Sequence, residues 1–67
     1  MTTGLKFFLI EREAYEALGI GQSLLRRMMA EGRIAGTHIG RRLVFHVDEV
    51  RRFAEALRRE SLDEAQH

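Results

Sequence analysis

Glycines on both sides of one short segment in the middle of the chain limit what the chain can fold into. Gly19 and Gly21 allow a tight turn before this segment, and Gly32 can take the left-handed conformation that commonly ends a helix. Between the turns, apolar residues recur at intervals of three and four, which places them on one face of a helix. These residues are Leu25, Met28 and Met29. The sequence therefore predicts a short helix with a defined start and end.

The opposite face of this predicted helix is polar and cationic, and it contains no acidic residue. Its members are Gln22, Ser23, Arg26, Arg27 and Ala30. Arginines on such a face are usually only solvated. A helix of about eleven residues is nevertheless roughly 16 Å long, and an α-helix fits the major groove of DNA, which is about 12 Å wide. The segment is therefore a candidate recognition helix, and the rest of the chain decides between the two interpretations.

The distribution of charge favours a polyanionic ligand, although the formal net charge is only +1. Residues 11–16 carry a net charge of −2, residues 22–46 carry +4, and residues 48–67 carry −2. A basic centre between acidic flanks predicts one cationic surface patch, whereas evenly mixed charges would indicate only solubility.

Size and composition exclude several classes of function. A chain of 67 residues forms one small domain, too short for a large active-site cleft, so we do not expect an enzyme. The chain has no cysteine and no apolar run of about twenty residues, and no signal cleavage site follows its N-terminal apolar run. We therefore expect a cytoplasmic location. The histidines, His38, His46 and His67, lack metal-ligand spacing, so neither a metal nor another cofactor is expected.

Two segments precede the candidate recognition helix. Residues 1–8 are expected to form an N-terminal arm, and the last part of this arm leads into a short extended or buried stretch that reaches Ile10. The segment Glu11–Leu18 is then predicted to be a first helix, because glutamates in its opening turn complement the helix dipole. Ala14 and Leu18 lie four residues apart and are expected to face the core.

After the candidate recognition helix the apolar period changes to two, which predicts two strands. One set of alternating positions is expected to face the core, namely Thr37, Ile39, Leu43 and Phe45, and the other to face outward, namely His38, Val44 and His46. Gly40-Arg41-Arg42 lies between the strands and predicts a hairpin tip. A solvated loop would tolerate any polar pair. Two adjacent arginines suit a phosphate backbone or a minor groove better, because each guanidinium can bind oxygens through two donors.

A last helix is predicted after the hairpin, with Asp48 as its cap. Its core-facing residues are Val50, Phe53, Ala54 and Leu57. Arginines and glutamates interleave on its other side, including Glu55 and Arg59 at a spacing of four, which is ordinary support for an exposed helix. The helices and the hairpin together are expected to occupy residues 9–60, and residues 61–67 a C-terminal tail.

This order of elements is that of a winged helix-turn-helix, a mostly helical α+β fold with three helices and a two-stranded wing. Residues 9–53 resemble the excisionase-type DNA-binding domains of the mercury-resistance-regulator-like (MerR-like) superfamily. The resemblance is carried by Ala14, Leu18-Gly19-Ile20, Arg27-Met28-Met29, Glu31-Gly32-Arg33-Ile34 and Ile39-Gly40-Arg41-Arg42, and by the core positions Leu43, Phe45, Val50 and Phe53.

The resemblance implies that the second helix enters the major groove and that the wing lies on the adjacent minor groove and backbone. The implied contacts are Gln22, Ser23, Arg26 and Arg27 on the helix and Gly40, Arg41 and Arg42 in the wing, with His38 and Arg33 as additional candidates. Arginine can pair with guanine and glutamine with adenine, whereas serine at a helix start more often binds a phosphate.

The function that the resemblance implies is that of an excisionase, which bends attachment-site DNA and directs site-specific recombination, as in prophages. The implied partners are double-stranded DNA, an integrase or recombinase, and a second copy of the chain placed head to tail on DNA. Two alternatives stay open. One is a small transcriptional regulator with the same fold, although activators of this superfamily usually carry a long dimerising helix. The other is a protein-interaction module whose basic face binds an acidic partner.

Four positions depart from the pattern of the excisionase-type domains. Gly21 stands in place of a serine or threonine helix cap, and Leu24 occupies a position that is usually polar. Val44 replaces an arginine of the wing, and His46 replaces a proline before the last helix. The start of the recognition helix, the wing and the start of the last helix are therefore the places where this chain is expected to differ.

Overall fold

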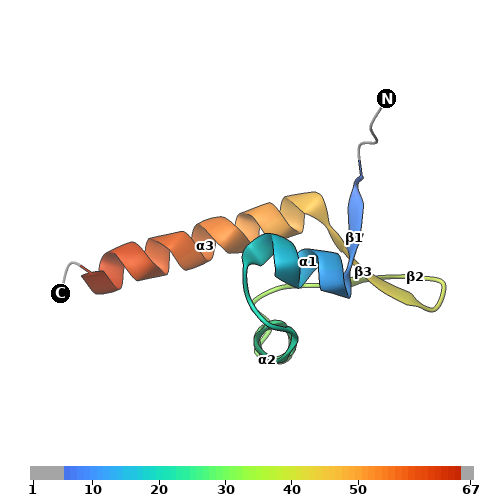
Figure 1. The fold of residues 1–67 in the computed structure, drawn as a ribbon, viewed down its shortest axis with the longest axis horizontal. Helices are drawn as coiled ribbons and strands as arrows, with labels where there is room; N and C mark the ends of the chain where they lie inside the picture. The colour runs from blue at the N-terminus through green and yellow to red at the C-terminus, as the bar shows by residue number, and fades with distance from the viewer. Residues whose placement is uncertain (1–5, 66–67) are drawn as a thin grey trace.

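The computed structural model describes residues 6–65, and side chains within residues 6–62. The described residues form three helices and three strands (Figure 1). In chain order these are β1 (Phe8–Ile10), α1 (Glu11–Leu18), α2 (Gln22–Ala30), β2 (Thr37–Ile39), β3 (Arg42–His46) and α3 (Val47–Ala65). The predicted mostly helical α+β architecture of a winged helix-turn-helix is thereby confirmed.

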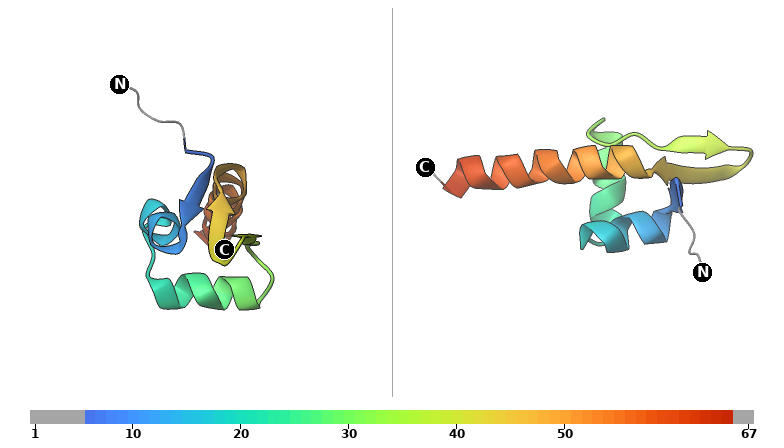
Figure 2. Two further views of the ribbon diagram at one scale, coloured as in Figure 1. Left: turned by 90° about the vertical axis from the view of Figure 1, so that its right-hand side faces the viewer. Right: turned by 90° about the horizontal axis from the view of Figure 1, so that it is seen from above.

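The three helices surround one small core, with the sheet at one end. α2 lies across the bottom of the molecule below α1 and α3, as the left view of Figure 2 shows. The β2–β3 hairpin extends from the body in one direction, and the C-terminal part of α3 extends in the other (Figure 1). This arrangement leaves one side of α2 and the tip of the hairpin uncovered.

The sheet contains one strand more than the sequence predicts. Its order is β1-β3-β2, and both pairings are antiparallel. β1 arises from the extended stretch before α1, and it pairs Leu9 with Phe45 and Ile10 with Val44. The backbone N–H of Val47 donates to the carbonyl of Phe7 at 2.9 Å and continues this pairing into the start of α3. β3 is therefore the central strand, and the hairpin is anchored to the body through it.

The register of the hairpin differs from the prediction. Ile39 pairs with Arg42, and His38 pairs with Leu43, so His38 lies on the core-facing side of the sheet together with Phe45. Thr37 and Ile39 lie on the opposite side, and Ile39 is 52% exposed. The expectation that Val44 faces outward was also wrong, because Val44 is 6% exposed and pairs with Ile10 of the added strand β1. The turn that joins β2 and β3 decides which of their residues face each other.

The core is formed by residues from every helix and from the sheet. Its largest fully buried side chains are Phe45, Phe53 and Leu25, and Ala14, Met28, Ile34 and Val50 complete it. Leu18, Met29, Leu43 and Leu57 are partly buried against this core, as expected, and so is Leu24. The prediction for Ala54 was wrong, because this residue is exposed while Val50 and Phe53 turn toward the body.

Both helices of the helix-turn-helix end in the same way. Gly19 and Gly32 have φ angles of 71° and 76°, in the left-handed region that only glycine adopts at low cost. After α2, the N–H groups of Gly32 and Arg33 donate to the carbonyls of Met29 and Met28 at 3.0 and 2.9 Å. This pair of hydrogen bonds is a Schellman motif. The predicted end of α2 is thereby confirmed, and Gly21 starts this helix without a side-chain cap.

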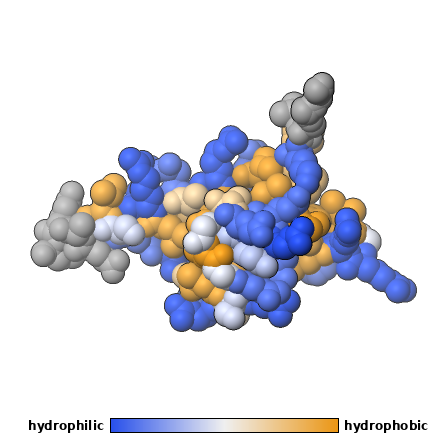
Figure 3. Space-filling model, in the orientation of Figure 1, coloured by the Kyte–Doolittle hydropathy of each residue, from blue (hydrophilic) through white to orange (hydrophobic). Residues whose placement is uncertain are grey.

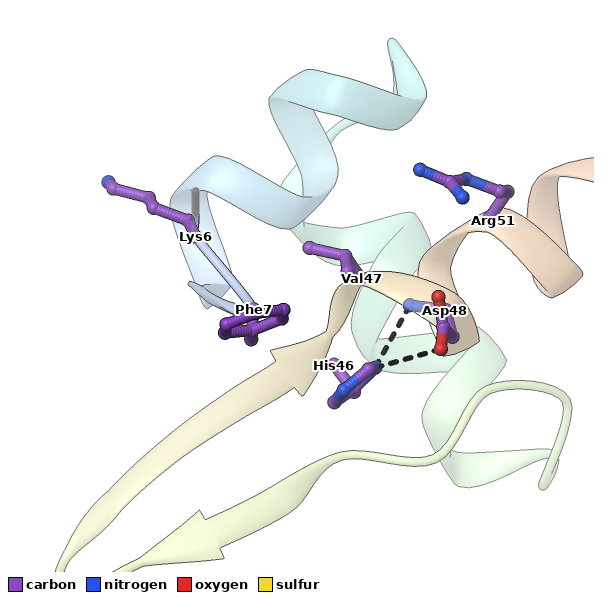
Figure 4. A pocket seen from close by; sticks show the side chains of 6 residues that line it. All are labelled: Lys6, Phe7, His46, Val47, Asp48 and Arg51. Atoms are coloured by element: carbon purple, nitrogen blue, oxygen red, sulfur yellow. Dashed lines mark hydrogen bonds and ion pairs between the residues drawn. The ribbon is translucent and has the colours of Figure 1, made fainter. Parts of the chain in front are cut away.

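α3 begins and ends differently from the prediction. The imidazole Nδ1 of His46 accepts a hydrogen bond from the backbone N–H of Asp48 at 3.0 Å, so His46 and not Asp48 caps the helix (Figure 4). This contact lies in a surface pocket lined by Lys6, Phe7, His46, Val47, Asp48 and Arg51. The helix also continues through residue 60 to Ala65, because the following residues include no glycine or proline that would stop it.

Candidate nucleic-acid interface

The outer face of α2 is available to a ligand. Leu25 and Met28 are the buried residues of this helix, and they point into the core as predicted. The predicted contact residues of α2 are all exposed, namely Gln22, Ser23, Arg26 and Arg27. In the space-filling view, hydrophilic residues predominate along the lower edge of the molecule, where α2 lies, and at the tip of the hairpin (Figure 3). The helix therefore presents a polar face to solvent and is not hidden in the interior.

Two of these four side chains share one partner on α1. The Nε and Nη2 atoms of Arg26 donate to the two carboxylate oxygens of Glu11 at 3.0 and 3.2 Å. The side-chain amide of Gln22 donates to Oε1 of the same carboxylate at 3.2 Å. Glu11 is the first residue of α1 and its side chain is 22% exposed, whereas that of Arg26 is 64% exposed. One acidic group thus joins the start of α1 to the exposed face of α2.

The electrostatics of this cluster keep both charged groups ionised at neutral pH. The hydrogen bonds from Arg26 and then from Gln22 lower the pKa of Glu11 below its ordinary value of 4.5. The same carboxylate raises the pKa of Arg26. The guanidinium of Arg26 is therefore a permanent cation whose charge is partly offset by a neighbouring anion.

The other two predicted contacts on α2 are less constrained. Arg27 lies 3.7 Å from Glu31, one turn further along the helix, and its side chain is 68% exposed. Exposed pairs at this spacing contribute only about 0.3–0.5 kcal/mol, so Arg27 can leave Glu31 at little cost. Ser23 is exposed near the N-terminus of α2 and makes no side-chain hydrogen bond within residues 6–65. Neither residue is held by the rest of the domain.

The hairpin tip carries the second predicted group of contacts. Gly40 has a φ angle of 62°, which explains why glycine stands at this turn. Arg41 and Arg42 are exposed, and neither forms an ion pair with any residue in the described part of the chain. Figure 1 shows the tip well to one side of α2, at the end of the extended hairpin. The expectation of one cationic surface patch was therefore wrong, because its exposed arginines lie on two separate elements, α2 and the hairpin tip.

The two additional candidates differ from each other in the structure. Arg33 forms an ion pair with Glu60 of α3, its Nη1 contacts the sulfur of Met28 at 3.5 Å, and its side chain is only 31% exposed. Its position after the end of α2 therefore serves to tie the helix-turn-helix to α3. His38 is exposed on the hairpin and makes no side-chain hydrogen bond to residues 6–65.

A second ion pair, which the sequence did not indicate as part of the site, holds the segment between α2 and the hairpin. Arg52 donates from Nε and Nη2 to the carboxylate of Glu49 at 2.8 Å, and its Nη2 also donates to the carbonyl of Arg33 at 2.9 Å. Glu49 accepts from the backbone N–H of Ala35 at 2.9 Å. Arg52 and then this N–H lower the pKa of Glu49 to about 2. The i,i+3 spacing was visible in the sequence, but the link to residues 33–35 was not.

The described residues offer few features of other functional classes. No group of three histidine, aspartate or glutamate side chains that could hold a metal ion occurs within residues 6–65. In the same part of the chain, no helix has the length and apolar character to cross a membrane. Exposed arginines occur on α2 and at the hairpin tip, and also on α3.

Comparison with known protein families connects this geometry to DNA. A family described as a helix-turn-helix domain matches residues 12–64, which is most of the chain. The chain belongs to this helix-turn-helix family. A search of curated proteins and a search of solved structures found no significant match. The match runs from α1 through α2 and the hairpin into the last turns of α3, so it includes the exposed arginines of both α2 and the hairpin tip. The chain is a DNA-binding helix-turn-helix domain.

Proposed function

We propose that this helix-turn-helix domain binds duplex DNA with α2 in the major groove and the β2–β3 hairpin on the adjacent minor groove and backbone. The observation that carries the proposal is the exposure of four polar side chains on one face of α2, namely Gln22, Ser23, Arg26 and Arg27. The separation between α2 and the hairpin tip also supports it (Figure 1), because an element in a groove and an element on the flanking backbone must contact different parts of the duplex.

Each group has a chemical role in this proposal. Arg26 and Arg27 pair with guanine, Gln22 pairs with adenine, and Ser23 binds a phosphate near the start of α2. At the hairpin tip, Arg41 and Arg42 bind phosphates regardless of sequence, and Gly40 allows the turn that presents them. His38 lies on the same hairpin and is an additional phosphate contact. Arg33 is assigned a structural role because Glu60 and Met28 already hold it.

Within DNA binding, we propose an excisionase-type role, in which the domain bends attachment-site DNA and acts with an integrase. The resemblance of residues 9–53 to excisionase-type domains supports this role. The proposed self-association places copies of the chain head to tail on one duplex. The inferred partners are therefore double-stranded DNA, an integrase or recombinase, and further copies of this chain.

A transcriptional regulator is the second candidate, and one observation favours it. α3 runs to Ala65 and projects beyond the body (Figure 1). Leu62, in the projecting part, is 50% exposed. Regulators of the MerR-like superfamily usually dimerise through a long helix after the wing. The projecting part of α3 is a surface on which such a contact could form.

Footprinting separates the two candidates. We would test protection of the integration site in the source genome and of the promoter of this gene. Protection confined to the integration site supports the excisionase, and protection confined to the promoter supports the regulator. Titration of salt against a duplex of random sequence tests DNA binding itself, because affinity for phosphates falls steeply with salt. If the wild-type domain binds no duplex at low salt, its basic face serves a protein partner instead.

A further inference from the structure

The carboxylate of Glu11 lies where it can fix the orientation of the two side chains of α2 for which we propose contacts with bases. Glu11 accepts both donors from one edge of the Arg26 guanidinium and a third from the amide of Gln22. Both partners belong to the face of α2 for which we propose a role in the major groove. Glu11 itself lies on α1, and its side chain is more buried than that of Arg26. An acid beside a DNA-binding surface repels phosphates, so its presence requires an explanation.

The atoms that Glu11 leaves unused on Arg26 form a donor pair. A guanidinium has five N–H groups, and Glu11 takes the one on Nε and one on Nη2. Both N–H groups of Nη1 and the second one of Nη2 stay unused by Glu11. The Nη1–Nη2 edge is therefore open, and its two parallel donors match the O6 and N7 acceptors of guanine. Glu11 thus holds the edge of Arg26 that base reading does not need.

Glu11 also leaves hydrogen-bonding groups of Gln22 free. An ionised carboxylate only accepts hydrogen bonds, so the side chain of Gln22 must turn its NH₂ group and not its carbonyl toward Glu11. One N–H of that group and the carbonyl oxygen are left for other partners. A donor and an acceptor on one amide are the groups that pair with N7 and N6 of adenine. Glu11 therefore fixes the orientation of both side chains without using the atoms that distinguish the bases.

We propose that Glu11 is a positioning residue that increases the sequence selectivity of α2. It holds Arg26 and Gln22 in one orientation, which lowers the entropy lost when they meet their bases, and its charge weakens the attraction of Arg26 to phosphates at arbitrary sites. The inference rests on the proposed function of α2 as the element that reads the major groove. A merely structural role, in which Glu11 only joins α1 to α2, predicts a change in stability but no change in selectivity.

The test compares Glu11→Gln with a matched control on the same helix. Glu16→Gln removes the same charge from α1, and Glu16 is exposed and forms no side-chain hydrogen bond or ion pair within the described residues. A preferred duplex is first selected from a pool of random sequence with the wild-type domain. Dissociation constants are then measured for this duplex and for a scrambled duplex of the same composition, at several salt concentrations.

We expect Glu11→Gln to reduce the ratio of affinities for the selected and scrambled duplexes by about threefold to tenfold. This factor corresponds to the conformational entropy that one or two released side chains must lose again on binding. Binding to the scrambled duplex should tighten, and its dependence on salt should steepen by about 0.9 in log–log slope, the effect of one added phosphate contact. Glu16→Gln should leave the ratio of affinities unchanged. Thermal unfolding of each variant shows whether the fold is retained.

A double-mutant cycle shows whether Glu11 acts through its two partners. In a chain that also carries Arg26→Ala and Gln22→Ala, Glu11→Gln should no longer change the ratio of affinities. An unchanged ratio in the single Glu11→Gln variant overturns the inference, and so does an effect that persists in the combined variant. If the wild-type domain binds DNA but selects no sequence, the inference about Glu11 fails while DNA binding stands. If it binds no duplex, both proposals fail.

Discussion

Individual side chains of this domain divide into those that are held and those that are free. Arg26, Arg33 and Arg52 each contact an acidic residue on another turn or element, whereas Arg41 and Arg42 have no ion-pair partner within residues 6–65. A held arginine loses less entropy when it meets a base, and a free arginine can follow a phosphate backbone of any sequence. This difference leads to two predictions at the scale of single residues.

The first prediction separates base reading from phosphate binding. Arg26→Ala should weaken binding to the preferred duplex by about 1–3 kcal/mol and relax the choice of base at one position. Arg41→Ala should weaken binding to every duplex by a similar factor and reduce the dependence on salt. Binding measurements on the preferred and scrambled duplexes check both. The assignment of roles is wrong if the two variants lose the same affinity on both duplexes.

The second prediction concerns pH. Arg52 and the N–H of Ala35 lower the pKa of Glu49 from 4.5 to about 2 in the folded state. A carboxyl group of this kind stabilises the fold above its unfolded-state pKa, and the contribution is lost as the pH falls toward the folded-state value. Glu49→Gln should therefore be less stable than the wild type at pH 7 by about 1 kcal/mol, the upper range for a surface pair.

The pH dependence is checked by urea unfolding of the wild type and of Glu49→Gln at several pH values. The difference in the free energy of unfolding should shrink between pH 4.5 and pH 2, because the wild-type carboxyl group becomes protonated in that window. A difference that stays constant down to pH 2 contradicts the assignment of the ion pair to Glu49 and Arg52.

At the scale of elements, the helix boundaries depend on backbone angles at glycines. Gly32 has a φ angle of 76°, but Gly21 has an extended conformation with a φ of −91°. A Cβ atom at either position would meet no neighbouring atom within 4 Å, so steric crowding does not distinguish the two sites, whereas backbone conformation does. Gly21 is moreover the N-cap of α2, where serine is preferred.

The two glycines should therefore respond to serine in opposite directions. Gly21→Ser should stabilise the domain by about 0.5–1 kcal/mol, because it adds a side-chain cap and restricts the unfolded chain. Gly32→Ser should destabilise it by about 1–2 kcal/mol, the cost of a side chain in the left-handed region. The free energies of unfolding in urea give both values. If both substitutions changed the free energy of unfolding in the same direction, backbone conformation would not be what determines their effect on stability.

Helices and strands differ in how well the sequence predicted them. Gly19, Gly32 and the apolar spacing of α2 act within a few residues, and these local signals correctly placed the two helices and the faces of α2. The register of the hairpin was wrong at Thr37 and Ile39, since it depends on which residue occupies the turn. The third strand and the contacts of Glu11 arise from residues that meet only in the folded chain, and no local pattern reports them. The cap by His46 joins residues two apart, and it was missed because histidine is not among the residues preferred at a helix N-cap.

At the scale of the whole molecule, the three helices and the sheet all pack against one small core. Phe53 is 1% exposed and packs with Leu25 and Phe45, which come from α2 and β3. Leu62, in the projecting part of α3, lies outside this core and is 50% exposed. The two ends of α3 therefore differ sharply in what they contribute to stability.

Phe53→Ala should lose about 3–5 kcal/mol, which is comparable to the total stability of a domain of this size. Circular dichroism should show it largely unfolded at 25 °C. Leu62→Ala should change the free energy of unfolding by less than about 0.5 kcal/mol, because it leaves no cavity. A large loss of stability from Leu62→Ala that depends on protein concentration would instead indicate that the projecting helix joins two copies.

The junctions between strands and helices have a consequence for the DNA. β1 is followed directly by α1, and β3 directly by α3, so no flexible linker separates the sheet from the two helices that support α2. Under the docking proposed above, we expect the duplex, more than the domain, to change its shape to fit. We then expect sites whose base steps kink or compress easily to bind better, even at positions that no side chain touches.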